Sequence, residues 1–217
     1  MITMDFEIIN PHVLKILIAA RKEDSIRAIS DRISLSYGWT YKWVQDLAKL
    51  GVFKLTRMKT FLNKDSQFYR RTIQYIKKIL TKDIQFNYGV LSLFGIEYCF
   101  TKLDSVFIWT SGGYNIARYK NFYPIFIKVR AKDRKLFEYY CKKLSLSINK
   151  RNGVFYKPVF LDDFKISYHE GTPVDSLGET IGFMEENIYN FEPALEMIKE
   201  MYNGKIKARY KEVITNV

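Results

Sequence analysis

The fold of the N-terminal third of the chain is decided by one stretch, YKWVQDLAKLGVF (residues 41–53), which follows the polar turn formed by residues 36–38. Apolar residues recur in it at helical spacing, at Trp43, Val44, Leu47 and Leu50, and predict a helix from Trp39 to Gly51 with one face turned inward. Gly51 is suited to end that helix in a left-handed cap. From Val52 to Lys64, apolar residues alternate with basic or polar ones around a turn, which predicts an extended ribbon.

Two shorter amphipathic segments precede this helix. Pro11 suits a helix start, and the apolar residues after it predict a first helix as far as Arg21. Asp24 or Ser25 can cap a second helix, in which Ile26, Ile29 and Ile33 face inward while Arg27 and Arg32 point outward. The order helix, helix, turn, helix, ribbon resembles the winged helix-turn-helix of transcription regulators. A small helical core without a ligand is the alternative.

In that resemblance the third helix enters the major groove of DNA and the ribbon is the wing. The outer face of the third helix carries side chains that can reach base edges and phosphates. The residues expected to contact DNA are Trp39, Thr40, Tyr41, Lys42, Gln45 and Lys49 on the helix, and Arg57, Lys59 and Lys64 on the ribbon.

Charge supports a polyanionic partner. The 217 residues carry a formal net charge of +12, and a basic surface attracts nucleic acid in a salt-dependent way. Residues 1–81 contribute +8, residues 82–157 +9 and residues 158–217 −5. We therefore do not expect the acidic C-terminal segment to face nucleic acid.

No cofactor or metal is expected from the sequence. Cys99 and Cys141 lie in segments predicted to be buried, and His12 and His169 are far from them, so no zinc spacing exists. Acidic residues occupy the place of the basic region of a secretory leader, and no apolar run approaches the roughly 18 residues of a membrane helix. These patterns predict a soluble cytoplasmic protein.

The predicted fold class is α+β, with a winged helix-turn-helix domain in residues 1–81 and an α+β effector or partner-binding domain with a helical C-terminal end in residues 82–217. The first domain closes with a linking helix over residues 66–81, capped by Ser66. Its stripe of Tyr69, Ile73, Ile76 and Leu80 suits either a core face or the seam of a homodimer.

In the second domain, alternation predicts a strand from Tyr123 to Arg130, followed by a helix over residues 133–144. Further strands are expected over residues 154–161 and 164–168. Helices are expected over residues 175–189, from Asn190 to Gly204, and over residues 208–214. The pieces at residues 90–94 and 102–107 fit either a helix or a strand.

The chain offers no catalytic motif. Ser111-Gly112-Gly113 lacks the partners of a phosphate-binding loop and predicts a turn. The adjacent Asp162 and Asp163 do not form the paired strand carboxylates of a nucleotidyltransferase. We therefore expect no enzyme activity.

The second domain also resembles that of AbiE-type antitoxin regulators. The resemblance rests on residues 98–106, on Tyr123-Pro124-Ile125-Phe126-Ile127-Lys128-Val129, and on residues 173–181 with 191–196. It implies a DNA-binding antitoxin that represses its own promoter and neutralises a nucleotidyltransferase-like toxin.

Three functional hypotheses follow. The first is a sequence-specific, DNA-binding transcriptional regulator that works as a homodimer. The second is a protein-interaction module that holds a toxin and has little DNA role. The third, an enzyme acting on RNA or nucleotides, rests on the basic residues between Lys102 and Lys157, which could surround a pocket.

Overall fold

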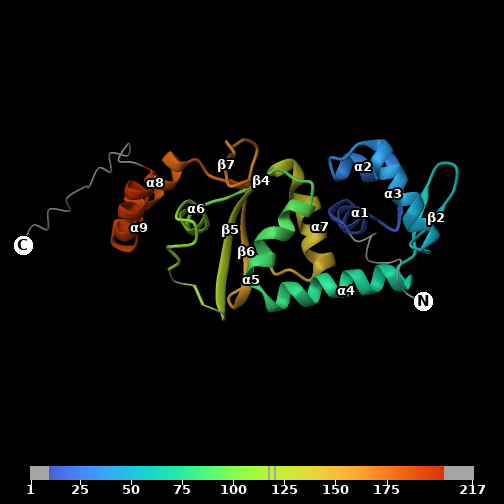
Figure 1. Ribbon diagram of the computed structural model, residues 1–217, viewed down its shortest axis with the longest axis horizontal. Helices are drawn as coiled ribbons and strands as arrows, with labels where there is room; N and C mark the ends of the chain where they lie inside the picture. The colour runs from blue at the N-terminus through green and yellow to red at the C-terminus, as the bar shows by residue number, and fades with distance from the viewer. Residues whose placement is uncertain (1–9, 117, 120, 203–217) are drawn as a thin grey trace, which may run out of the picture. The chain divides into compact units, whose positions relative to one another are not determined.

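The computed structural model describes residues 10–116, 118–119 and 121–202 (Figure 1). The chain divides into two compact units. Unit 1 comprises Met1–Ile96 and Lys135–Leu146, and unit 2 comprises Glu97–Arg134 and Ser147–Val217. Helices occur together with a sheet in each unit, so the α+β class expected from the sequence is confirmed.

The division of the chain is less simple than a cut after residue 81. The first segment of unit 1 continues to Ile96, and the unit takes in residues 135–146, which were expected in the second domain. The end expected at Gly204 and the helix expected over residues 208–214 lie outside the described residues.

Unit 1 begins with three helices and a small sheet. Side chains of Asn10, Ser25 and Ser36 accept hydrogen bonds from the first turns of the three helices, which fixes where each one starts. The sheet has the order β1-β3-β2, and both pairings are antiparallel. The elements are α1 (Pro11–Ala19), β1 (Glu23–Asp24), α2 (Ile26–Arg32), α3 (Tyr37–Lys49), β2 (Phe53–Leu55) and β3 (Thr60–Leu62).

The end of α3 follows the expectation. Gly51 has a φ of +70°, and the amides of Gly51 and Val52 donate to the carbonyls of Ala48 and Leu47. This left-handed cap turns the chain directly into β2.

Four further elements complete unit 1. Phe94, which follows η1, lies with its ring centre 4.9 Å from that of Tyr140 on α7, and both side chains are fully buried. Gly95, with a φ of +65°, lies so close to α2 that a Cβ would come within 2.7 Å of Ile33 Cα. The elements are α4 (Gln67–Lys82), α5 (Ile84–Gly89), the 3₁₀ helix η1 (Val90–Leu93) and α7 (Arg134–Leu144).

Helix α7 is tied to the end of α1 by hydrogen bonds. The ammonium group of Lys143 donates to the carbonyls of Leu17, Ile18 and Ala20 at 3.0, 2.9 and 2.7 Å, and the hydroxyl of Tyr139 donates to Ala20 at 3.0 Å. These bonds satisfy carbonyls that a helix end leaves unpaired. A fragment ending at residue 81 would therefore lack part of this unit.

Arg32 differs from the expectation that it points outward. Its guanidinium makes a bidentate ion pair with Asp24 at 2.7 and 2.9 Å and also donates to the carbonyl of Ala19. Only 10% of its side chain is exposed. The planar guanidinium thus links α2 to β1 and α1.

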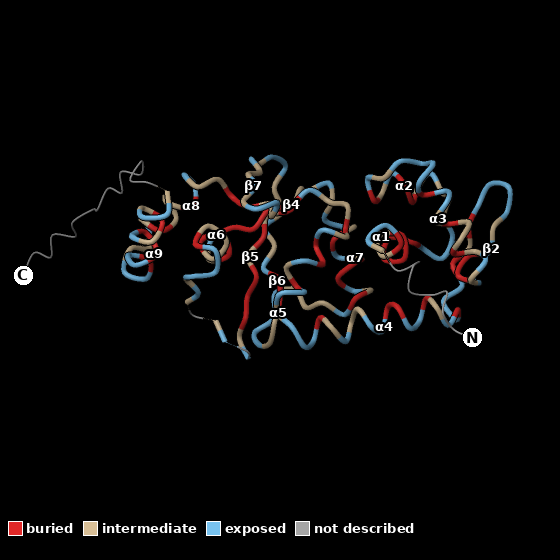
Figure 2. The backbone as a smooth tube through the Cα atoms, viewed as in Figure 1, coloured by how far each residue is buried: buried red, intermediate tan, exposed pale blue. Residues whose placement is uncertain are grey.

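Unit 2 is built on a five-stranded sheet in the order β6-β5-β4-β8-β7. The long strands β5 and β6 pair in parallel from Phe122↔Gly153 to Arg130↔Leu161. Most of β5 is buried (Figure 2). The strands are β4 (Tyr98–Phe100), β5 (Phe122–Arg130), β6 (Gly153–Leu161), β7 (Ser167–His169) and β8 (Thr172–Val174).

Three helices pack together beside this sheet. Val106 of α6, Met184 of α8 and Leu195 of α9 belong to one buried cluster. A capping box between Ser176 and Glu179 starts α8. The bounds are α6 (Leu103–Trp109), α8 (Leu177–Glu186) and α9 (Ile188–Met201), and the 3₁₀ helix η2 (Ala131–Asp133) precedes α7.

Two buried carboxylates hold unit 2 together. Asp104 and Arg118 form an ion pair at 2.6 Å, with both side chains fully buried, and Asp104 also accepts from the amide of Phe126. Asp175 pairs with Lys128 at 2.8 Å. Burial lowers the pKa of Lys128, but the hydrogen bond and the charge of Asp175 raise it, and the pKa is raised overall. Burial also raises the pKa of the Cys99 thiol, which contacts Asp175.

Most sequence-based elements are confirmed, with shifted ends. The helices over 66–81 and 133–144 and the strands over 123–130 and 154–161 are present, and the residues 90–94 and 102–107 are mainly helical. The strand expected over 164–168 is confined to Ser167–His169. Asn187, not Asn190, precedes α9. No helix in the described part of the chain is long and apolar enough to cross a membrane.

Candidate nucleic-acid interface

The first half of α3 presents three large aromatic side chains to solvent. The exposed fractions are 46% for Tyr37, 54% for Trp39 and 44% for Tyr41. Lys42 is also exposed. Meanwhile Val44 and Leu47, on the opposite face of α3, are fully buried. The helix is therefore anchored by its apolar stripe and leaves an aromatic and basic surface free.

These exposed side chains contact one another. The ring of Trp39 stacks on that of His12, with centres 6.0 Å apart, and the rings of Tyr37 and Tyr41 lie at the same separation. Lys42 places its ammonium group 5.4 Å from the centre of the Trp39 ring. Mutual contacts of this kind limit the rotamers of exposed side chains, so the surface is partly ordered before any ligand binds.

Thr40 must be removed from the expected contact residues. It is fully buried, and its hydroxyl donates to the carbonyl of Ser36 at 3.0 Å. Helical geometry explains the correction, because Thr40 lies one turn before Val44 and shares its inward face. Gln45 is half-buried, and Lys49 is exposed but forms an ion pair with Asp46 at 2.7 Å.

The hairpin β2–β3 carries Arg57 and Lys59, whereas Lys64 is exposed in the turn that follows β3. Its turn is closed by a hydrogen bond from the amide of Thr56 to the carbonyl of Lys59 at 2.8 Å. Arg57 and Met58 project from that turn, and 78% of Met58 is exposed. Lys59 forms an exposed ion pair with Glu23 of β1. The tip of the hairpin is thus basic with one apolar side chain.

Net charge is concentrated in the unit that carries this surface. Unit 1 contains 19 Lys and Arg against 9 Asp and Glu, whereas unit 2 contains 16 against 14. The sequence places the basic residues of 82–157 in one block, whereas the fold divides that block between the units. Residues 135–146, which carry Lys135, Lys142 and Lys143 against Glu138, raise the net charge of unit 1 from +8 to +10 and leave +2 on unit 2.

Two residues of this surface, Tyr37 and His12, are not among those expected from the sequence. Tyr37 was assigned to a turn, but it is the first residue of α3 and precedes Tyr41 by one helical turn. The sequence shows His12 only as distant from both cysteines, and it is the fold that brings it to Trp39. The spacing of four between the tyrosines was a usable signal, whereas nothing in the sequence pairs His12 with Trp39.

Comparisons with protein families, curated proteins and solved structures find no match to this chain. Within the described residues, no three His, Cys, Asp or Glu side chains come together in a way that could hold a metal ion.

Proposed function

We propose that unit 1 contains a winged helix-turn-helix domain and that the protein is a sequence-specific, DNA-binding transcriptional regulator. The order of α1, β1, α2, α3 and the hairpin β2–β3 supports this proposal. The observation that carries it is the exposed aromatic and basic surface at the start of α3, next in sequence to an exposed basic hairpin. A helix that is anchored on one face and exposes such side chains on the other is suited to enter a major groove.

In this proposal the two parts of the surface have different tasks. Lys42 and Gln45 contact base edges, where long hydrogen-bonding side chains can discriminate sequences. Arg57 and Lys64 contact phosphates, which positions the protein without reading sequence. Trp39 and Tyr41 supply flat apolar area against the sugar and thymine methyl groups that line the groove.

Selection from a random library of duplex DNA by the full chain tests the proposal. The full chain is required because α7 contributes to unit 1. Repeated enrichment of one sequence motif is the expected result. Recovery of random sequences only, at low and moderate salt, would show that the protein binds DNA as a non-specific polycation. That result would contradict the proposal.

The more specific role of an autorepressing antitoxin rests on the resemblance of the second domain to AbiE-type regulators. In that role the protein binds its own promoter as a homodimer in the cytoplasm and has a nucleotidyltransferase-like toxin as partner. Two results test this role: the protein binds the promoter of its own gene, and expression of the neighbouring gene is toxic alone but not when this protein is co-expressed.

A further inference from the structure

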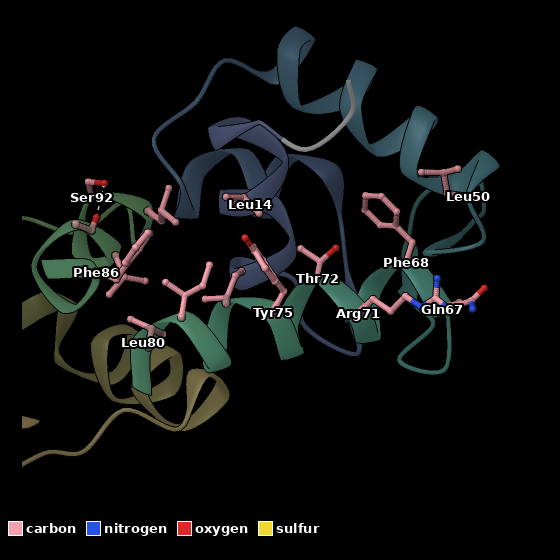
Figure 3. A pocket seen from close by; sticks show the side chains of 15 residues that line it. Leu14, Leu50, Gln67, Phe68, Arg71, Thr72, Tyr75, Leu80, Phe86 and Ser92 are labelled. Carbon is pink, nitrogen blue, oxygen red and sulfur yellow. Dashed lines mark hydrogen bonds between the residues drawn. The ribbon is translucent and has the colours of Figure 1, made fainter. Parts of the chain in front are cut away.

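Unit 1 contains an open groove that the proposed DNA contact does not use. The groove runs along α4 from Leu50 and Phe68 at one end to Phe86 at the other, and its volume is about 1140 Å³ (Figure 3). Its lining is mostly apolar and comes from α1, the end of α3, α4, α5 and η1. It therefore belongs to unit 1 alone.

The floor of the groove follows one stripe of α4. Phe68, Tyr75 and Ile79 line it at spacings of seven and four, which place them on one side of the helix. Two aromatic side chains there are open to solvent, with 65% of Tyr75 and 50% of Phe86 exposed. A continuous apolar surface of this kind marks a contact site in a folded protein.

One rim of the groove is basic. Arg71 lines the groove, and helical spacing places Lys78 and Lys82, seven and eleven residues later, on the same side of α4; all three are exposed. The sequence of α4 contains no Asp or Glu. None of the three makes an ion pair with the described residues. The rim can thus receive carboxylates from an occupant.

We propose that this groove binds an acidic amphipathic helix of a protein partner. Such a helix matches both features at once, since its apolar stripe covers Tyr75 and Ile79 while its Glu or Asp side chains pair with the rim. A second copy of the chain fits less well, because two basic α4 helices would repel each other. A small ligand also fits less well, because the site is open and its volume exceeds the range of about 300–1000 Å³ usual for small-ligand pockets.

The length of the groove sets the size of the partner segment. Helix α4 has 16 residues and is therefore about 24 Å long. A partner helix of about four turns spans it with apolar residues at positions i, i+4, i+7 and i+11. One end of that helix contacts Leu50, which caps α3. The inference is independent of DNA binding, because the groove lies along α4 and the proposed DNA contacts lie on α3 and the hairpin.

The test uses the full chain and two synthetic peptides as long as α4. Both have leucines at those four positions and a fluorescent label. In the first, the flank that faces the rim carries Glu, and in the second each Glu is replaced by Lys. We expect fluorescence anisotropy to detect salt-dependent binding of the Glu peptide, and about tenfold weaker binding of the Lys peptide because like charges face the rim.

Variants assign the binding to the groove. Tyr75→Glu should abolish binding of the Glu peptide, and the double change Arg71→Glu with Lys78→Glu should reverse the preference toward the Lys peptide. Lys165→Glu, at an exposed residue of unit 2, is the matched control and should retain the preference of the unchanged chain. Circular dichroism checks that each variant is folded.

Each of four results would overturn the proposal. Equal affinity for both peptides, or binding insensitive to Tyr75→Glu, would remove the role of the groove and its rim. A dimer that Tyr75→Glu dissociates, seen by light scattering, would assign the groove to a second copy of the chain. Binding of dodecanoate without binding of either peptide would assign it to a small amphiphile. Failure of the full chain to bind DNA would contradict the proposed function alone, because the peptide-binding results do not depend on DNA.

Discussion

The ammonium group of Lys42 lies 5.4 Å from the centre of the Trp39 ring and 5.5 Å from that of Trp43. It lies within cation–π distance of one exposed indole ring, Trp39, and one half-buried ring, Trp43, and at exposed sites such contacts contribute about 0.5–1 kcal/mol each. A lysine restrained in this way loses less conformational entropy when it binds a base edge than a free one would. The relationship therefore favours Lys42 as a residue that discriminates sequences.

We expect Lys42→Ala and Gln45→Ala to reduce the preference for the selected DNA motif over a scrambled duplex by about 1–3 kcal/mol each, because each removes a base contact. Thr40→Val is the matched control on the same helix. Because the Thr40 side chain is buried, the preference of the Thr40→Val variant for the motif should equal that of the unchanged chain. Electrophoretic mobility shift on both duplexes measures the ratio. Equal losses on the two duplexes would show that α3 does not read bases.

Arg57→Ala should weaken binding to all duplexes alike and lower the slope of log affinity against log salt by about one, since it removes one phosphate contact. Lys59→Ala should have a smaller effect, because Lys59 is paired with Glu23. Glu23→Gln releases Lys59 and should raise affinity. Titrations at several salt concentrations check all three. An unchanged salt slope in Arg57→Ala would exclude the hairpin from the contact.

Lys143 should make the stability of the protein depend on pH. Burial lowers its pKa to about 7, with smaller contributions from Lys64 and Arg32 and an opposing one from Asp24. An unfolded lysine titrates near pH 10.4, about three units higher. Between the two values the unfolded chain binds more protons, so the free energy of unfolding rises with pH.

The comparison of the unchanged chain with Lys143→Met isolates this effect. We expect urea unfolding to show a rise in stability from about pH 7 to about pH 9.5 in the unchanged chain and a flatter profile in the variant. Measurements stop there because unfolded tyrosines titrate near pH 10, whereas burial raises the pKa of Tyr69 to about 12. Parallel profiles would mean that Lys143 remains charged in the folded state.

The sequence predicted local structure well and the assembly of the units poorly. The helix that became α3, its stop at Gly51 and the strand that became β5 follow from periodicity and local backbone preferences, which neighbouring residues determine. The place of α7 in unit 1 does not, because Lys143 bonds to the end of α1 across more than 120 residues. Local patterns contain no information about such a contact.

The same limit applies to the candidate site. The exposure of Tyr41 and Lys42 follows from the helical stripe. The burial of Thr40 could also have been predicted, because Thr40 lies four residues before Val44 on the same face. The pairing of Arg32 with Asp24 and the stack of His12 on Trp39 depend on how α1, α2 and α3 pack. Phe68, Tyr75 and Ile79 of the groove along α4 lie outside the predicted stripe of Tyr69, Ile73, Ile76 and Leu80, so the groove was not foreseeable from that stripe.

Arg118→Met should destabilise unit 2 by about 3–5 kcal/mol, because it leaves Asp104 buried without its ion-pair partner. Arg27→Met is the matched control. It breaks an exposed ion pair, in which the side chain of Arg27 is 72% and that of Asp31 62% exposed. The change should alter stability by less than about 1 kcal/mol. Urea unfolding followed by circular dichroism compares the two. Similar small effects of both changes would contradict a structural role for the buried pair.

The proposed DNA contact of α3 is tested most directly by photo-crosslinking. A benzophenone amino acid is placed at Trp39 in one sample of the full chain and at Tyr168, an exposed residue of unit 2, in another. After irradiation with the selected duplex, we predict a crosslink to bases of the motif from position 39 and none from position 168. A crosslink from position 168 alone, or none from position 39 on a duplex that is bound, would contradict the account.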